Sequence, residues 1–426
     1  MKQSFCKINK IEGELVFRGD KSISHRSVIF SALSEGKSVI KNLSNSDDVA
    51  STINCFKELG VEFNFLEDQL EVIGRGINSF NEPSSQLDAG NSGTTARLLS
   101  GILAAQNFNS ELIGDESLSK RPMSRVANPL RLMGANIVLS DNNFLPMKIN
   151  KSTLHSIEYE LDIASAQIKS ALLLAAIHLP KESKIIENLI TRDHTERMLQ
   201  LPTFYERGGK IIFASQLYYP KKSIYNVPGD ISSASFFIVL TLLSKNSELI
   251  IKNCSLNESR IGIIEVLQQM GGDISIISQN RNIGEPIGDL IVKSSPHLSN
   301  IKLEEKIIPN IIDELPILSI AGIFAEGDFE VRNARELRIK ETDRINAVCR
   351  NMENAGITIT EFEDGFRLSG SPKSQSNIFE SYGDHRIAMS FAILGMLLDN
   401  ETLINDFESV SISNPMFLDQ LAQISN

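Results

Sequence analysis

The chain has 426 residues, of which 42% are hydrophobic and 22% charged, and its formal net charge is −11. Such a length suits two or three domains, and the composition is that of a soluble globular protein. The acidic balance argues against nucleic acid as the main partner, because proteins that bind a phosphate backbone usually carry a basic surface. The four cysteines are isolated, and no apolar run reaches the roughly 18–20 residues that span a bilayer. We therefore expect a cytoplasmic protein with no membrane partner.

One pattern recurs along the chain: a segment with helical periodicity ends in glycine, and two short alternating strands follow. The glycines are Gly60, Gly134, Gly208, Gly271 and Gly356, spaced by 74, 74, 63 and 85 residues. A glycine suits the left-handed position just after a helix. Chance recurrence stays open, because the pattern is simple. If it is a true repeat, six units nearly fill the chain, and the sixth has to be assembled from the two ends.

Two turn signals interrupt this pattern, and each precedes a serine-rich helix start. They are Arg18-Gly19-Asp20 and Val227-Pro228-Gly229-Asp230. Glycine and proline together with aspartate are typical of turns that lead into a helix. We expect hinges near residues 18–20 and 227–230.

The segment Arg335–Ile345 holds four cations and three anions in eleven residues. Lys340 and Arg344 are four apart, so a helix would place them on one face, with Glu341 and Asp343 beside it. Such a face could bind an anion while Glu341 handles a proton. The alternative is a solvated helix face with ordinary ion pairs, which are common and weak.

Compact polar clusters stand where several helices are expected to begin. They are 19–26, 90–97, 120–123, 165–169, 191–197 and 383–386. We expect the helices themselves at about 24–33, 95–105 and 387–398. A helix N-terminus with nearby lysine or arginine favours anions, although simple capping explains each cluster taken alone. No spacing typical of a metal site or of a P-loop is present, so no metal is expected.

Three candidates for acid–base chemistry remain. Asp313 and Glu314 stand inside an apolar run, where a carboxylate either caps a helix or has a perturbed pKa. Glu341 lies beside Lys340, and His385 lies beside Arg386. No cysteine falls near any cluster, which argues against a thiol nucleophile.

The ordered motifs closely resemble the 5-enolpyruvylshikimate-3-phosphate synthase family over essentially the whole chain. The segments that carry the resemblance are Gly19–Arg26, Gly90–Arg97, Arg121–Met123, Ser165–Lys169, Arg192–Glu196, Pro228–Ala234, Lys340–Arg344 and Gly383–Met389. The resemblance implies a two-domain inside-out α/β barrel built from six βαβαββ repeats, three per domain. The first domain is then expected at 20–228 and the second at 1–19 plus 229–426.

The same resemblance implies transfer of the enolpyruvyl group of phosphoenolpyruvate to the 5-hydroxyl of shikimate 3-phosphate, with release of phosphate. In this family the reaction is an addition followed by an elimination, belongs to the shikimate pathway to chorismate and aromatic amino acids, and needs no cofactor. Both substrates are polyanions, which accounts for so many cations and helix N-termini. We expect a monomer whose partners are these two small molecules, and whose domains close to exclude water.

The resemblance also assigns roles to individual positions. Residues expected to bind shikimate 3-phosphate are Lys21, Ser22, Arg26, Ser165, Gln167, Asp313 and Lys340. Residues expected to bind phosphoenolpyruvate are Lys21, Gly93, Arg121, Gln167, Arg344 and Arg386. Residues expected to take part in catalysis are Asp313 as the base for the 5-hydroxyl, Glu341 for proton transfer at the methylene carbon, Lys21 and His385.

Some positions depart from the pattern of many family members. They are Leu98, Ala166, His194, Glu336 and Ile412, the last standing where others have a lysine that binds phosphoenolpyruvate. The motifs Ser165-Ala166-Gln167 and Arg192–Glu196 resemble the second class of these enzymes, which is often less sensitive to glyphosate. We therefore expect no lysine contact from the C-terminal segment.

Three alternative functions fit the sequence less well. A UDP-N-acetylglucosamine enolpyruvyl transferase usually needs a cysteine in a loop that corresponds to 115–122, where this chain has none. A non-catalytic phosphoester-binding protein would tolerate loss of Asp313 and Glu341, and both are present. An RNA 3′-phosphate cyclase shares the βαβαββ unit, but the acidic charge argues against it.

Overall fold

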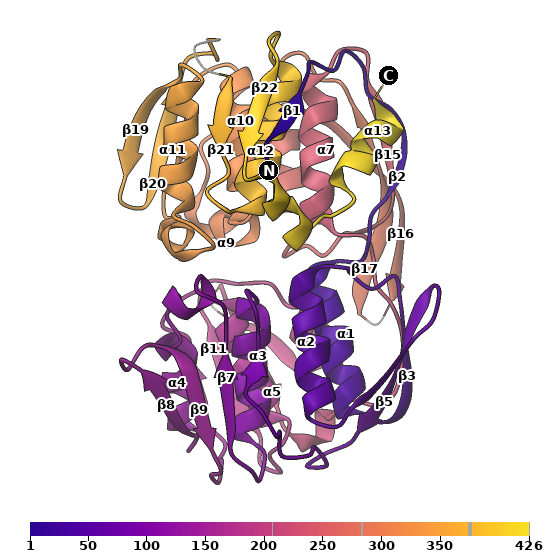
Figure 1. The fold of residues 1–426 in the computed structure, drawn as a ribbon, viewed down its shortest axis with the longest axis vertical. Coiled ribbons are helices and arrows are strands. Elements are labelled where there is room, and N and C mark those ends of the chain that lie inside the picture. The colour runs from indigo at the N-terminus through magenta and orange to yellow at the C-terminus, as the bar shows by residue number, and fades with distance from the viewer. Residues whose placement is uncertain (207, 283, 374–376, 426) are drawn as a thin grey trace. The chain divides into compact units, whose positions relative to one another are not determined.

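The computed structural model describes residues 1–206, 208–282, 284–373 and 377–425. The chain folds into two compact units, which we call the N-unit and the C-unit (Figure 1). The N-unit is Arg18–Val227 with Arg281–Glu285, and the C-unit is Met1–Phe17, Pro228–Asn280 and Pro286–Asn426. The segment Arg281–Glu285 is thus grouped with the N-unit, although it stands between two segments of the C-unit in the sequence.

The described strands of the N-unit form three four-stranded sheets, and these sheets share one order of pairing. The first contains β14 (Ile224–Asn226), β3 (Glu35–Lys41), β5 (Gln69–Arg75) and β4 (Glu62–Phe65). The second contains β6 (Leu87–Asp88), β7 (Ser110–Ile113), β9 (Phe144–Asn150) and β8 (Asn136–Ser140). The third contains β10 (Glu158–Glu160), β11 (Ser183–Glu187), β13 (Gly209–Ala214) and β12 (Thr203–Glu206). In each, two parallel strands are followed by an antiparallel pair.

Helices connect these strands in pairs. The N-unit helices are α1 (Lys21–Leu33), α2 (Asp47–Glu58), α3 (Gly93–Ala104), α4 (Ser124–Leu132), α5 (Ala166–Ala176) and α6 (His194–Leu199). Short 3₁₀ turns lie at η1 (Leu118–Lys120) and η2 (Gln216–Tyr218). The second and third sets therefore read βαβαββ in chain order, as the resemblance predicted, and in the first set β14 supplies the leading strand although it comes last in the chain.

The C-unit also holds three sheets among the described residues. They contain β16 (Asp273–Asn282), β17 (Glu285–Lys293), β15 (Glu248–Ser255) and β2 (Glu12–Val16); β18 (Phe329–Val331), β20 (Gly365–Ser369) and β19 (Thr358–Phe362); and β1 (Gln3–Phe5), β22 (Thr402–Asn405) and β21 (Ile378–Glu380). Its helices are α7 (Ile231–Leu243), α8 (Gly262–Gln269), α9 (Ile308–Ile311), α10 (Leu315–Phe324), α11 (Arg344–Asn354), α12 (His385–Leu397) and α13 (Phe417–Ile424). The 3₁₀ turns are η3 (Glu305–Ile307), η4 (Arg335–Ile339) and η5 (Phe407–Ile412).

Two features of the pairing explain how the repeats fill the chain. Strand β2 precedes α1 in sequence but pairs in parallel with β15 of the C-unit, and β14 precedes α7 but pairs in parallel with β3 of the N-unit. Near the other end of the chain, β22 pairs antiparallel with the N-terminal strand β1. The prediction that the sixth repeat is assembled from both ends of the chain is confirmed.

Four of the five predicted glycines end a helix as expected. Gly60, Gly134, Gly271 and Gly356 each stand two residues beyond a helix, with φ between 79° and 100°. The prediction was wrong at Gly208, which lies in the turn between β12 and β13. The preceding helix, α6, ends instead at Gln200, whose φ is 52°. Arg207, in the same predicted segment, lies outside the described residues.

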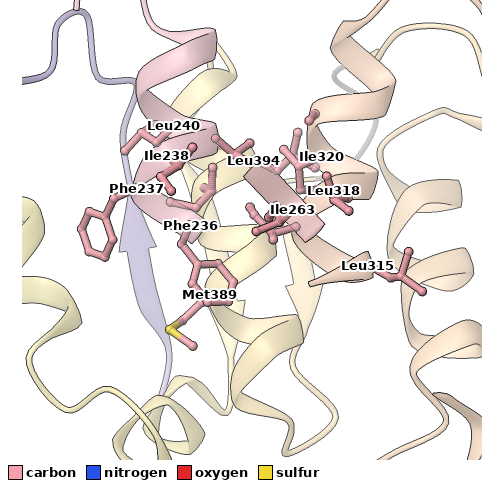
Figure 2. Close-up of a cluster of buried hydrophobic side chains, with 14 of the residues drawn as sticks. Phe236, Phe237, Ile238, Leu240, Ile263, Leu315, Leu318, Ile320, Met389 and Leu394 are labelled. Carbon is pink, nitrogen blue, oxygen red and sulfur yellow. The ribbon is translucent and has the colours of Figure 1, made fainter. Parts of the chain in front are cut away.

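Three helices of the C-unit are apolar on nearly every face, so they have to be buried. Figure 2 shows their side chains packed together, among them Phe236, Ile238 and Leu240 of α7, Leu318 and Ile320 of α10, and Met389 and Leu394 of α12. Charged residues are confined to the first turn of α12 and to the residues just before α7 and α10. These N-terminal ends contact one another, so burial of the helices gathers the charged residues at one end.

No single helix in the described part of the chain is long and apolar enough to cross a membrane. Residues Glu305–Ile311 and Leu315–Phe324 pass that test only as a pair bent by 113°. Leu315–Ile323 is buried in the C-unit.

Gly101 of α3 marks the closest approach of two helices in the N-unit. A methyl group at Gly101 would lie 2.1 Å from the backbone oxygen of Ala171 in α5. We expect Gly101→Ala to lower the melting temperature, because overpacking costs about 1–3 kcal/mol and alanine regains only roughly 1 kcal/mol of helix propensity. Thermal unfolding tests this, and a melting temperature at or above wild type would mean that α3 and α5 separate without cost.

Candidate active-site residues

Three helices of the N-unit begin with a side-chain cap. Asp20 accepts from the backbone N–H of Ile23 at 2.9 Å in α1, and Ser92 accepts from that of Thr95 at 3.1 Å in α3. Ser165 caps α5 at 3.4 Å. The first two helices begin earlier than predicted, at Lys21 and Gly93, because the cap lies further upstream. The polar motifs therefore form the first turns of these helices, where anions are favoured.

Arg26 is a cation at the start of α1 that three acceptors of the protein hold in place. Its Nε donates to Thr195 Oγ1 at 2.7 Å, its Nη2 to Ser170 Oγ at 2.8 Å, and its Nη1 to the carbonyl of Ser22 at 2.9 Å. Only 4% of the residue is exposed. Burial lowers the pKa of Arg26 to about 10, although Glu196 and Asp20 counteract it. The guanidinium remains charged at neutral pH, in an orientation set by three acceptors.

Gln167 joins the first turns of α3 and α5. Its amide nitrogen donates to Thr94 Oγ1 at 3.0 Å, and its oxygen accepts from Arg97 Nη1 at 2.8 Å. Sequence reasoning did not assign Arg97 a role, although it lies in the glycine-rich motif. Its position one turn after Gly93 is the signal that could have indicated it.

Arg121 lies against the start of α3. Its Nη2 donates to Asn91 Oδ1 at 2.7 Å and to Ser117 Oγ at 3.2 Å. A methyl group at Gly93 would meet the Nη1 atoms of Arg97 at 2.5 Å and Arg121 at 3.7 Å. Glycine at this position therefore leaves room for two cations beside the helix N-terminus.

Lys21 opens α1 and is paired with a carboxylate that the sequence did not indicate. Its Nζ lies 2.7 Å from Asp48 Oδ2, in the first turn of α2. The lysine side chain is 22% exposed, so it is accessible from solvent. Ser22 follows it in the same turn. The N-unit thus collects Lys21, Ser22 and Arg26 on one helix start.

Behind Arg26 lies a group of buried charges, which we call the buried ion cluster: Lys169, Glu187, Asp193, Glu196 and Lys210. Lys169 Nζ is 2.8 Å from both Glu187 Oε1 and Glu196 Oε1, and Lys210 Nζ is 2.9 Å from Glu196 Oε1. The side chains of both lysines and both glutamates are at most 2% exposed. Because Ser170 and Thr195 adjoin Lys169 and Glu196, the cluster fixes the two hydroxyls that hold Arg26.

Arg344 is the centre of the C-unit residues. Its Nε lies 2.7 Å from Asp384 Oδ2, its Nη1 3.2 Å from Asp313 Oδ1, and its Nη2 2.5 Å from Glu341 Oε2. Burial alone would lower the pKa of Arg344, but Asp384, Glu341 and Asp313 outweigh it and raise that pKa. Sequence reasoning missed Asp384, whose place before His385 and Arg386 was read only as part of a helix start.

The segment Arg335–Ile345 is not one helix, so the prediction that Lys340 and Arg344 share a helix face is wrong. The 3₁₀ turn η4 ends at Ile339, and α11 begins at Arg344 because Asp343 caps it. The two cations nevertheless meet at one atom. Lys340 Nζ is 3.4 Å from Asp313 Oδ1, the oxygen that Arg344 also contacts.

Arg386 lies in the first turn of α12, which begins at His385, two residues earlier than the predicted helix start. Asp384 accepts from its backbone N–H at 2.8 Å and caps the helix. Its Nη1 donates to the carbonyl of Asp313 at 3.0 Å and approaches Glu314 Oε1 at 3.4 Å. His385 is 2% exposed. Asp313, Glu341, Arg344, His385 and Arg386 thus gather in the C-unit.

The departures from the family pattern lie in varied surroundings. His194 Nδ1 is 2.8 Å from Glu285 Oε1, and Leu98 is fully buried in α3. Ala166 is the first residue of α5, Glu336 lies in η4, and Ile412 ends η5.

Comparisons with known proteins agree over the full chain. The family model of EPSP synthase (3-phosphoshikimate 1-carboxyvinyltransferase) matches residues 6–421. Proteins named 3-phosphoshikimate 1-carboxyvinyltransferase from Petrotoga mobilis and Syntrophomonas wolfei are each 44% identical, covering 100% and 98% of this chain and 99% and 98% of their own. A solved EPSP synthase from Acinetobacter baumannii is 38% identical with a TM-score of 0.86, covering 100% of this chain and 98% of its own. The enolpyruvyl transferase NikO from Streptomyces tendae, 14% identical with a TM-score of 0.76, shares the fold.

Proposed function

This chain belongs to the EPSP synthase family, and from that premise we propose that it transfers the enolpyruvyl group of phosphoenolpyruvate to the 5-hydroxyl of shikimate 3-phosphate. The observation that carries the proposal is 44% identity, over the whole length, to proteins named for this reaction. The product is 5-enolpyruvylshikimate 3-phosphate, and phosphate is released. Alternative acceptors find no support in these relatives. We also propose that the enzyme works as a cytoplasmic monomer without a cofactor.

The N-unit residues bind phosphate and carboxylate groups. Lys21, Ser22 and Arg26 hold shikimate 3-phosphate, with Ser165 and Gln167. The fixed guanidinium of Arg26 supports this role, because three bonds to the protein hold its positive charge beside a helix N-terminus, where an anion is favoured.

The N-unit contacts to phosphoenolpyruvate come from the start of α3 and its surroundings. Gly93 brings the backbone close, and Arg121 supplies the charge; Lys21 and Gln167 reach the same substrate. Support comes from the room that Gly93 leaves beside two arginines.

The C-unit residues carry the chemistry. Lys340 and Asp313 contact shikimate 3-phosphate, and Arg344 and Arg386 bind phosphoenolpyruvate. Glu341 delivers a proton to the methylene carbon while Asp313 takes the proton of the attacking 5-hydroxyl, with His385 adjacent. The oxygen adds to C2 and gives a tetrahedral ketal. Phosphate then leaves as the methyl carbon gives up a proton, which restores the double bond.

The arrangement of Asp313 supports its role as the base. Lys340 and Arg344 both lie within 3.4 Å of its Oδ1, and nearby cations favour the ionised carboxylate that a base requires. Its neighbours also stabilise charge that develops in the transition state.

Release of phosphate tests the proposal directly. Purified protein is given phosphoenolpyruvate with either shikimate 3-phosphate or UDP-N-acetylglucosamine, without metal or nucleotide. We expect phosphate only with shikimate 3-phosphate. Release only with UDP-N-acetylglucosamine would mean that the chain transfers the enolpyruvyl group to this nucleotide sugar instead. Release with neither acceptor would contradict enolpyruvyl transfer to either of them.

A further inference from the structure

Glu314 is a buried carboxylate to which neither the family pattern discussed above nor the proposed mechanism gives a role. It stands directly after Asp313 and at the start of α10, yet its side chain makes no capping hydrogen bond. Only 1% of the residue is exposed. A charge this deeply buried is costly unless it is paired. Its partners therefore indicate what it is for.

Two buried cations lie on either side of this carboxylate. On one side, Ser232 Oγ donates to Glu314 Oε1 and accepts from Arg260 Nη2 at 2.8 Å. Arg260 is 3% exposed. On the other side, Arg386 Nη1 lies 3.4 Å from the same Glu314 oxygen. Glu314 is thus shared between a structural arginine and one of the arginines assigned to phosphoenolpyruvate.

The contacts of Arg386 use one end of its guanidinium. Nη1 is directed to two acceptors from consecutive residues, the carbonyl of Asp313 at 3.0 Å and the carboxylate of Glu314 at 3.4 Å. Within the described residues, no acceptor is bonded to Nε or Nη2 of Arg386. Holding Nη1 in this way leaves the opposite edge of the guanidinium available for a bidentate contact with an anion.

We propose that Glu314 is the positioning residue of Arg386, and that its carboxylate holds the guanidinium so that the Nε–Nη2 edge meets phosphoenolpyruvate. This inference rests on the proposed function, because it takes the binding role of Arg386 as given. Glu314 touches neither substrate, so it acts through Arg386 alone. Preorganised supports of this kind lower the cost of orienting a flexible side chain at binding.

Glu314→Gln preserves the size of the side chain and replaces a charged acceptor by a neutral one. We expect the KM for phosphoenolpyruvate to rise about five- to tenfold, since a hydrogen bond to a charged group is stronger than a neutral one by about that factor. The KM for shikimate 3-phosphate should not change. Steady-state phosphate release measures both, and Arg386→Ala gives the loss expected when the cation is absent.

If Glu314 only stabilised the fold, its substitution would change the melting temperature but not the binding of phosphoenolpyruvate specifically. Two further variants distinguish this structural role from the positioning role. Arg260→Met removes the other cation, whose Nη2 also lies 3.6 Å from Asp230 Oδ1, so it should lower the melting temperature without raising the KM for phosphoenolpyruvate. The double variant Glu314→Gln/Arg260→Met removes one buried charge of each sign, so the net charge around Ser232 stays as in wild type. We expect its melting temperature to recover part of the loss seen in Arg260→Met while its defect for phosphoenolpyruvate persists. Glu326→Gln, an exposed carboxylate just beyond the other end of α10, is the matched control.

Two results would overturn the inference. One is a wild-type KM for phosphoenolpyruvate in the double variant, and the other is an equal rise for both substrates in Glu314→Gln. The wild-type enzyme reports separately on the proposed function, because absence of phosphate release there contradicts the reaction itself. In that case calorimetric binding of phosphoenolpyruvate to wild type, Glu314→Gln and Arg386→Ala still decides whether Glu314 acts on Arg386.

Discussion

Replacing Asp313 by asparagine is expected to lower kcat about a thousandfold, because general-base catalysis contributes roughly 10²- to 10⁴-fold. Asparagine retains an oxygen that can accept from Arg344, whose Nη1 lies 3.2 Å from the present carboxylate. It cannot take the proton of the 5-hydroxyl. The Kd for shikimate 3-phosphate should therefore change little while turnover is lost. Steady-state phosphate release gives kcat, and calorimetry gives the Kd.

Asp364→Asn is a matched control in the same unit. Asp364 is also paired with an arginine, Arg332 Nε at 3.0 Å, but it lies outside the residues around Arg344. Its substitution should leave kcat at the wild-type value. If Asp313→Asn kept kcat within about tenfold of wild type, below the usual range for a general base, another group would have to take the proton.

The charged segment before α11 shows what the spacing of residues predicts correctly and what it does not. Helical spacing predicted that Lys340 and Arg344 lie together, and they do, but through Asp313 rather than along a helix. The helical spacing of charged residues continues across the whole segment. Asp343 nevertheless accepts a hydrogen bond from the backbone N–H of Asn346 at 3.0 Å and so begins a new helix. An aspartate competes with the helix for backbone donors, so a run of helical spacing can contain a helix start.

Repeats and motif residues were predictable because each has a local signal, such as a glycine after a helix or a cation at a helix start. The helix end at Gln200 was missed because a left-handed residue there is usually glycine. The partners of the key cations were also missed. Asp384 follows Arg344 by 40 residues and Thr195 follows Arg26 by 169, and only the packing of one repeat on another brings them together.

The buried ion cluster of the N-unit gives the largest expected effect on stability. Lys210→Met should lower the free energy of unfolding by about 3–5 kcal/mol, because removing one member of a buried ion pair leaves an uncompensated charge. In this variant Glu196 keeps its ion pair with Lys169 but loses the one with Lys210 Nζ, which lies 2.9 Å from its Oε1. Asp193 also loses Lys210 Nζ, which lies 3.7 Å from its Oδ2. Chemical denaturation of the purified variant measures the difference.

Lys184→Met provides the control, because it breaks an ion pair of similar length at the surface. Lys184 Nζ lies 2.8 Å from Glu158 Oε1, with side chains 31% and 64% exposed. Exposed pairs contribute about 0–1 kcal/mol, so this variant should unfold nearly as wild type does. A double variant, Lys210→Met with Glu196→Gln, should recover part of the loss, because the cluster then loses one charge of each sign.

The dependence of this effect on pH follows from two opposite shifts. Burial raises the pKa of Glu196, but Lys169 and Lys210 outweigh burial and hold it below its ordinary value of 4.5. Burial lowers the pKa of Lys210, but Glu196 and Asp193 outweigh it and raise it above 10.5. Because the pKa of Glu196 is lowered on folding, its charge stabilises the fold fully above pH 4.5. Because the pKa of Lys210 is raised on folding, its charge stabilises the fold fully below pH 10.5. The full contribution of the pair is therefore present between these two pH values. The difference in the free energy of unfolding between wild type and Lys210→Met should therefore be largest near neutral pH and should shrink as pH falls below 4.5. A difference that stayed constant down to pH 3 would mean that lost packing of the lysine stem, rather than its charge, accounts for the effect.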